Sequence, residues 1–91
     1  MPYVLPERRN LLVRFDEKSR QLAVSTLEIT SPGDLAFVFY RLCQLYIIRN
    51  GRKFETLNGL VGVLETTKGE VSRRILAPYE DRKMRENGDV E

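Results

Sequence analysis

Residues 34–49, DLAFVFYRLCQLYIIR, constrain the fold more than any other stretch of this chain. Apolar side chains recur along it at intervals of three and four residues, which is the spacing of an α-helix. Further apolar residues fall on its other sides, and only Arg41 and Gln44 are clearly polar in its middle. A helix that is apolar on nearly all sides is typical of a buried helix. We therefore predict a central helix that needs cover around most of its circumference.

Both ends of this predicted helix carry boundary signals. Ser31 or Gly33 can serve as the N-cap, with Asp34 favourably placed in the first turn. Arg49 lies in the last turn, and Gly51 supplies the left-handed residue that stops a helix. A chain of 91 residues has little material with which to surround such a helix. We expect the surplus apolar face to contact another subunit, so that the central helix assembles a homo-oligomer.

The part of the chain before the central helix gives weaker signals. Residues 1–5 are predicted to be an extended lead-in, because a proline disfavours helical geometry in the residue before it. A first helix is expected over residues 7–19. The stretch 22–30 is ambiguous, because its β-branched residues favour a strand. Since no second strand-like segment is recognised to pair with it, we interpret it as helix continuation or irregular structure.

A third helix is predicted after the central one, with Thr56 as its N-cap. Its apolar stripe has the members Leu57, Leu60, Val61, Leu64, Val71, Ile75 and Tyr79. Gly59 and Gly62 lie three residues apart, which favours close packing of another helix, the alternative being a ligand against bare backbone. Pro78 removes one helical hydrogen bond and is expected to kink the helix or to end it near Ala77.

The predicted fold class is all-α: a single domain of three helices spanning residues 1–91. The connection over residues 51–55 is short, so the last two helices are expected to form an antiparallel hairpin. Helical structure is expected to stop at Gly88, and residues 87–91 are predicted to be a flexible tail.

Composition excludes several classes of function. The net charge is +2, which is too small to predict nucleic-acid binding. The absence of histidine removes the commonest general base and metal ligand, so we expect no cofactor, no metal and no enzymatic activity. Cys43 is the single cysteine and is predicted to be a buried free thiol, which suits a reducing compartment. With no signal peptide or membrane-spanning run recognised, a cytoplasmic protein without a membrane partner is expected.

Acidic residues in the last third of the chain raise one enzymatic alternative. Helical pyrophosphohydrolases hold magnesium with acids that converge from two facing helices. Here the acids are Glu65, Glu70, Glu80 and Asp81. The central helix adds only Asp34, at its very end, so a magnesium-dependent nucleotide hydrolase ranks last among the hypotheses.

The densest polar group lies in the run SRRILAPYEDRK. Its candidate ligand-binding residues are Arg73, Arg74, Tyr79, Glu80, Asp81 and Lys83. Arginine suits planar recognition of phosphate, and Tyr79 could stack on a base. Arg73 and Arg74 differ by about 100° around a helix, so we expect them to face different ways, one reaching an interface or a pocket. The alternatives are a solvated face with ion pairs such as Glu70–Arg74, and a surface for a protein partner.

Several strings in this chain resemble a family of short proteins from tailed phages and bacteria. They are the opening Met-Pro-Tyr, the string GDLAFVFYRL, and LNGLVGVLETTKGEVSRRILAPYEDRKMRENGDV, and they cover most of residues 1–3 and 33–90. The chain departs from the family pattern at Ala36 and Phe37, where the family usually carries Asn-Tyr. The resemblance implies a small helical, phage-associated protein with no established activity. It also implies that Arg73, Arg74, Pro78, Tyr79, Glu80, Asp81, Asn87, Gly88 and Asp89 belong to the family pattern.

The sequence thus predicts a non-enzymatic, homo-oligomeric helical binding protein. Its partners would be further copies of itself and an anionic, nucleotide-like ligand, such as an immune signal captured by a phage protein in the host cytoplasm. A protein-interaction or structural adaptor is the first alternative.

Overall fold

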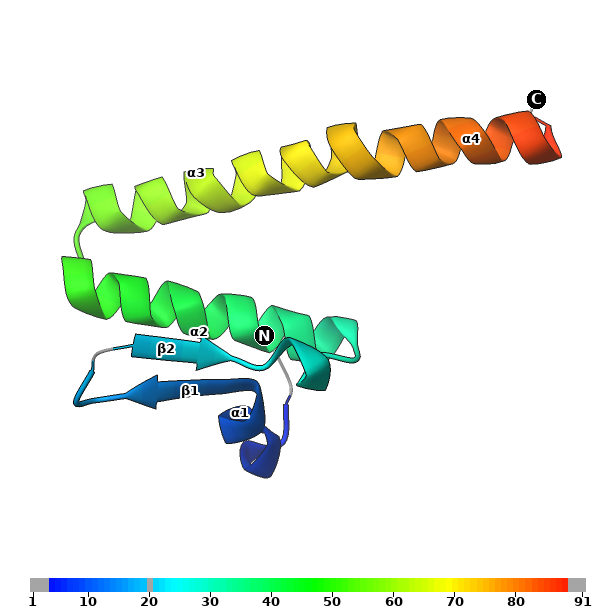
Figure 1. Cartoon of the computed structure of the whole chain (residues 1–91). Coiled ribbons are helices and arrows are strands. Elements are labelled where there is room, and N and C mark those ends of the chain that lie inside the picture. The colour runs from blue at the N-terminus through cyan, green and yellow to red at the C-terminus, as the bar shows by residue number, and fades with distance from the viewer. Residues whose placement is uncertain (1–3, 20, 89–91) are drawn as a thin grey trace. The chain divides into compact units, whose positions relative to one another are not determined.

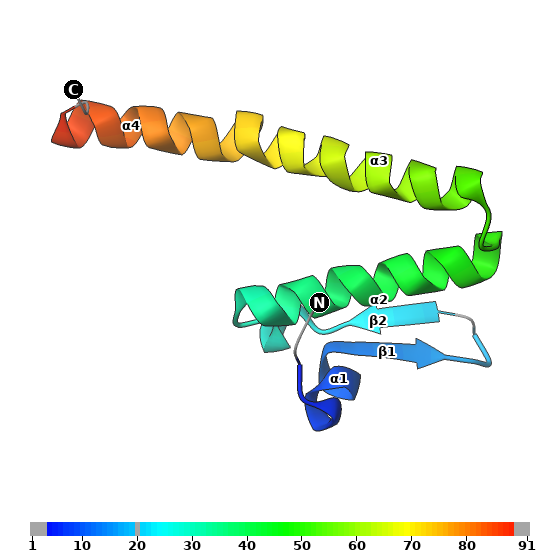
Figure 2. The same cartoon turned by 180° about the vertical axis from the view of Figure 1, so that it is seen from behind.

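The computed structural model of the chain describes residues 4–19 and 21–88 (Figures 1 and 2). The chain divides into two units, Met1–Gly51 and Arg52–Glu91, and each is described by itself. Within the described ranges, no helix has the length and apolar character needed to cross a membrane.

The first unit contains two helices and a small sheet. Helix α1 (Pro6–Leu12) is followed by strands β1 (Val13–Asp16) and β2 (Gln21–Val24), a 3₁₀ turn (Thr26–Glu28) and helix α2 (Pro32–Asn50). Figures 1 and 2 both show β2 between β1 and α2. The predicted lead-in is described only at its last two residues, which belong to no helix or strand.

The two-stranded sheet corrects the all-α prediction. The strands are antiparallel, and Val13 pairs with Val24 while Phe15 pairs with Leu22. The helix expected over residues 7–19 therefore ends at Leu12, because the sequence Val-Arg-Phe-Asp alternates apolar and polar residues as a strand does. The partner of the strand in residues 22–30 is thus Val13–Asp16, which lies within the residues predicted to be the first helix.

The core of the first unit is small. Its buried apolar residues are Val4, Leu12, Val13, Phe37 and Val38, with Leu22 and Ile29 packed against them. Leu12 is completely buried. The two α2 members lie in its N-terminal half, so α1, β1 and the start of α2 share this core, while the C-terminal half of α2 adds no buried residue to it.

Both predicted boundaries of the central helix are confirmed. The hydroxyl of Ser31 accepts a hydrogen bond of 3.1 Å from the N–H of Asp34, so Ser31 is the N-cap. Gly51 ends the helix with φ of 94°, a conformation that favours glycine. The pattern of apolar residues and these two caps together predicted α2 to within two residues at each end.

Nearly all described residues of the second unit form one continuous helix, which we call the long helix. It comprises α3 (Phe54–Val71), a π turn (Ser72–Leu76) and α4 (Ala77–Asn87). The prediction that Thr56 is the N-cap of this helix is wrong. The N-cap is Lys53, and Thr56 lies inside the first turn and is buried. The helix stops at Gly88, as expected, with φ of 85°. Asn87 is therefore helical, and the rest of the predicted tail after Gly88 lies outside the described residues.

The π turn explains why the long helix does not end near Ala77. Pro78 has no N–H, and in an α-helix its ring would clash with the carbonyl of Arg74. Instead, the N–H of Ala77 donates to the carbonyl of Ser72, five residues back. A π turn holds one residue more than an α turn, so side chains beyond it are rotated by about 100°. Tyr79 is thereby displaced from the stripe of Leu57 and Ile75 that the sequence had extended to it.

Candidate functional site

Helix α2 carries an uncovered apolar stripe on one side. Its members Leu35, Phe39, Leu42 and Tyr46 follow at spacings of four, three and four residues, and each is 40–49% exposed. We call this set the α2 stripe. It is distinct from the side of α2 that carries the buried Phe37 and Val38. The first unit by itself therefore leaves this side of the central helix uncovered, and whether a whole protomer does so stays a prediction.

A hollow in the first unit adjoins the α2 stripe. It lies between the hairpin and the C-terminal half of α2, and its apolar lining comes from Phe15, Leu22, Leu42, Leu45, Tyr46 and Ile48, with Arg49 and Asn50 at the helix end. Leu42 and Tyr46 thus belong to both surfaces. The sequence predicted that Cys43 is buried, but its side chain is partly exposed because α2 lacks cover here.

The long helix carries a second uncovered stripe. Its members are Leu57, Val61, Leu64, Val71 and Ile75, which we call the long-helix stripe, and they are 36–65% exposed. A single helix cannot bury its own side chains, so this stripe needs cover from outside its unit. At Gly59 and Gly62, no described atom apart from the helix's own nearby backbone lies within 4 Å of an added Cβ, so no helix packs there within this unit and the predicted close packing stays a prediction.

The predicted anion-binding arginines both contact one carboxylate. Arg73 Nη2 lies 2.5 Å from Glu70 Oε1, and Arg74 Nε lies 2.6 Å from Glu70 Oε2. The expectation that these arginines face different ways is therefore wrong, because their long side chains converge on Glu70. The predicted Glu70–Arg74 ion pair is confirmed. All three side chains are well exposed, and such pairs contribute only about 0.2–1 kcal/mol each.

The rest of the predicted cluster lies on α4 and is exposed. The charged groups of Arg82 and Lys83 lie 5.5 and 5.7 Å from the centre of the Tyr79 ring. Lys83 also pairs with Glu86 at 3.2 Å. The remaining two candidates, Glu80 and Asp81, are exposed as well. Within the second unit, these candidate residues therefore lie exposed on the surface of one helix.

Acidic residues were the basis of the hydrolase hypothesis. In residues 4–19 and 21–88, no three cysteine, aspartate or glutamate side chains come together in a way that could hold a metal ion. Glu70 is instead engaged by two arginines. The described structure therefore supplies no argument for the hydrolase.

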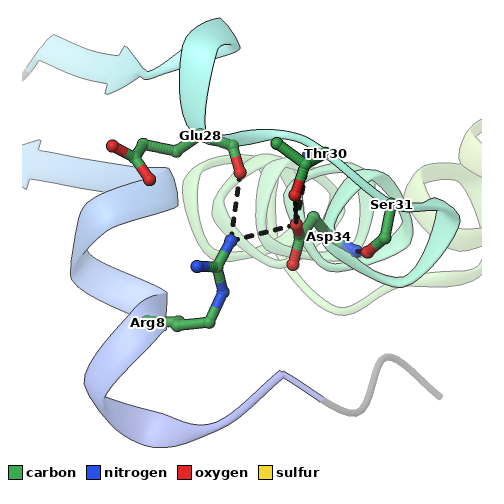
Figure 3. A network of polar contacts seen from close by, with 5 residues as sticks. All are labelled: Arg8, Glu28, Thr30, Ser31 and Asp34. Carbon is green, nitrogen blue, oxygen red and sulfur yellow. Dashed lines mark hydrogen bonds and ion pairs between the residues drawn. The ribbon is translucent and has the colours of Figure 1, made fainter.

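Sequence reasoning missed a polar network that joins α1 to the start of α2 (Figure 3). Arg8 donates to the carbonyl of Glu28 and to Oδ2 of Asp34, both at 3.0 Å. The same Oδ2 accepts from the backbone N–H of Thr30 at 3.2 Å and from its hydroxyl at 3.3 Å. The sequence signal was the spacing Ser31-x-x-Asp34, a variant of the capping box. The network fixes the entry of the chain to α2.

The network predicts how stability changes with pH. The hydrogen bond from the Thr30 N–H lowers the pKa of Asp34 most, the Arg8 guanidinium adds to this, and burial opposes it. A lowered folded-state pKa stabilises the fold above the unfolded pKa, and this contribution is lost as pH falls through the folded value. Urea unfolding should therefore show Asp34→Asn less stable than the native chain at pH 7, with the difference shrinking below about pH 4. A difference that stays constant down to pH 2 would contradict this assignment.

Comparison with known proteins gives one match. A search of curated proteins and a search of solved structures found no match to this chain. The model of a family described as a domain of unknown function, DUF6899, matches residues 1–90. This agrees with the resemblance to a family of unknown function noted from the sequence. Since the match covers nearly the whole chain, the protein belongs to the DUF6899 family.

Proposed function

We propose that the protein is a non-enzymatic, homo-oligomeric helical binding protein that works as an interaction module. The observation that supports this most is the contrast between a core of five apolar residues and two exposed apolar stripes. Fully burying one large apolar side chain contributes roughly 1.5–3 kcal/mol. The nine stripe residues are each about half exposed, so covering them would add stabilisation comparable to that of the core. We take a second copy of the chain as the partner, because other copies are present wherever the protein is made.

The long helix adds a separate argument for assembly. Most helical stability in proteins comes from packing of an apolar face, and isolated helices are marginal in water. Gly59, Gly62 and Gly69 each weaken the long helix by about 1 kcal/mol relative to alanine. A long helix with three glycines therefore needs a packing partner to remain helical.

A charge placed in the α2 stripe tests this proposal. Phe39→Asp puts a carboxylate in the middle of the stripe, and burying an unpaired charge is strongly unfavourable. We expect light scattering after size exclusion to show a lower mass than for the native chain. Tyr40→Asp is the matched control, because Tyr40 is an aromatic residue of similar exposure that lies about 100° further round α2, away from the stripe, and this variant should keep the native mass. Equal masses for the native chain and Phe39→Asp would contradict a role of this stripe in assembly.

An anionic ligand remains a second candidate. The observation that favours it is the convergence of two guanidinium groups on Glu70, since a phosphate group could replace that carboxylate. In the phage setting that the resemblance implies, the ligand would be a nucleotide signal of host defence. Thermal-shift titration with linear and cyclic nucleotides should then stabilise the native chain and stabilise Glu70→Gln further. No stabilisation by any of them would remove this candidate.

A further inference from the structure

We infer that two copies of the chain pair through their long helices in antiparallel orientation, with the twofold axis between the helices at the level of Thr66. This inference rests on the proposed homo-oligomer and deepens it by naming one contact surface and its direction. The occupant of the long-helix stripe is thus the same stripe of a second copy.

The spacing of the stripe reads the same in both directions. Together with Lys68, which fills its one gap, the stripe has spacings of four, three, four, three and four residues. Reversing the helix about Thr66 superimposes the positions of Leu57 and Ile75, and those of Val61 and Val71. Alternating spacings of three and four are those of a coiled-coil seam, in which side chains of one helix fill gaps on the other. The stripe is therefore complementary to a reversed copy of itself.

The charges of the helix are complementary in the same register. Residues 54–65 contain two acidic residues and no basic one, which gives −2. Residues 67–78 contain three basic residues and one acidic residue, which gives +2. An antiparallel pair places each negative half beside the positive half of the other copy. Complementary charges of this kind set the partner and the orientation of paired helices.

A parallel pair would bring like charges together. Lys68, the charged member of the seam, would lie opposite its own copy. In the antiparallel register, Lys68 instead lies opposite Leu64, where its aliphatic stem can pack while its ammonium group reaches water. The seam thus avoids like-charge contact only in the antiparallel direction.

Disulfide trapping tests the direction of pairing. In a Cys43→Ser background, Leu57→Cys and Ile75→Cys chains are prepared separately, one with a tag that changes its mass, then mixed and mildly oxidised. We expect most of the crosslinked product to join one chain of each kind, and Leu57→Cys alone to give little. Thr66→Cys is the control, since Thr66 lies on the opposite side of the helix. A product from Leu57→Cys alone that exceeds the mixed product would overturn the inference.

A second variant covers the case in which the cysteine chains fail to fold. Leu64→Glu places a carboxylate opposite Lys68 in the antiparallel register, so the native mass should be kept. In a parallel pair the new carboxylates would face each other, and loss of the native mass would overturn the inference. The mass of the native chain distinguishes failure of the pairing from failure of the proposed function. If the native chain is assembled but gives the wrong crosslinks, only the antiparallel pairing is overturned. If the native chain is a monomer, both the pairing and the proposed homo-oligomer are overturned.

Discussion

Replacing Val61 with glutamate is expected to convert the assembled protein into monomers. In the antiparallel pair, Val61 packs against Val71 of the other copy, and each pair contains this contact twice. Losing the burial of two valines costs at least ~3 kcal/mol, even before the added charges are counted. The dissociation constant should therefore rise at least about 100-fold. Sedimentation velocity over a range of concentrations measures this change.

Thr66→Glu is the control for this substitution. Thr66 is exposed on the side of the helix opposite the long-helix stripe, and both variants place the new glutamate four residues before another acid. The two substitutions should thus have similar effects on the helix itself. If Val61→Glu and Thr66→Glu dissociate equally, or if neither does, the stripe is not the contact surface.

Leu12→Ala is expected to unfold the first unit in a large fraction of molecules. Leu12 is the one described side chain that is completely buried, and its loss leaves a cavity in a core of five residues. Leu→Ala substitutions in cores cost about 2–5 kcal/mol. A unit of 51 residues is stable by only roughly 2.5–7.5 kcal/mol, so the loss is comparable to the total. Urea unfolding followed by circular dichroism provides the measurement.

Leu27→Ala is the matched control for this second prediction. Leu27 belongs to the same unit but is 91% exposed, so its truncation removes little buried surface. Its urea midpoint should lie close to that of the native chain. Should the two variants unfold at the same urea concentration, Leu12 would not be the centre of the core.

The sequence predicted the central helix and missed the sheet for physical reasons. Local signals, the Ser31 N-cap and the left-handed Gly51, define α2 without reference to other segments. A strand depends on a partner elsewhere in the chain, and Val13–Asp16 is too short to be distinguished from the end of a helix. The π turn was missed because a proline inside a helix can have two effects. It can end the helix, or the hydrogen bonds before it can rearrange so that the helix continues, and the sequence does not select between these outcomes.

The candidate site was predictable in part. The composition of α2 indicated a surplus apolar face, and the exposure of Phe39 agrees with this. The periodicity of the long helix indicated an apolar stripe, but not that residues such as Val61 are exposed within their unit. The convergence of Arg73 and Arg74 was missed because helical angles describe Cα positions, whereas arginine side chains are long enough to reach the same carboxylate. The Arg8–Asp34 pair joins residues 26 positions apart, and such long-range pairs have no local signal.

Assembly of the chain is the central claim, and its mass in solution tests it most directly. Sedimentation equilibrium of the native protein should give a mass of at least twice the 10.6 kDa of one chain at micromolar concentration, falling on dilution. A mass of 10.6 kDa at every concentration, in a sample whose circular dichroism shows the long helix fully formed, would contradict it.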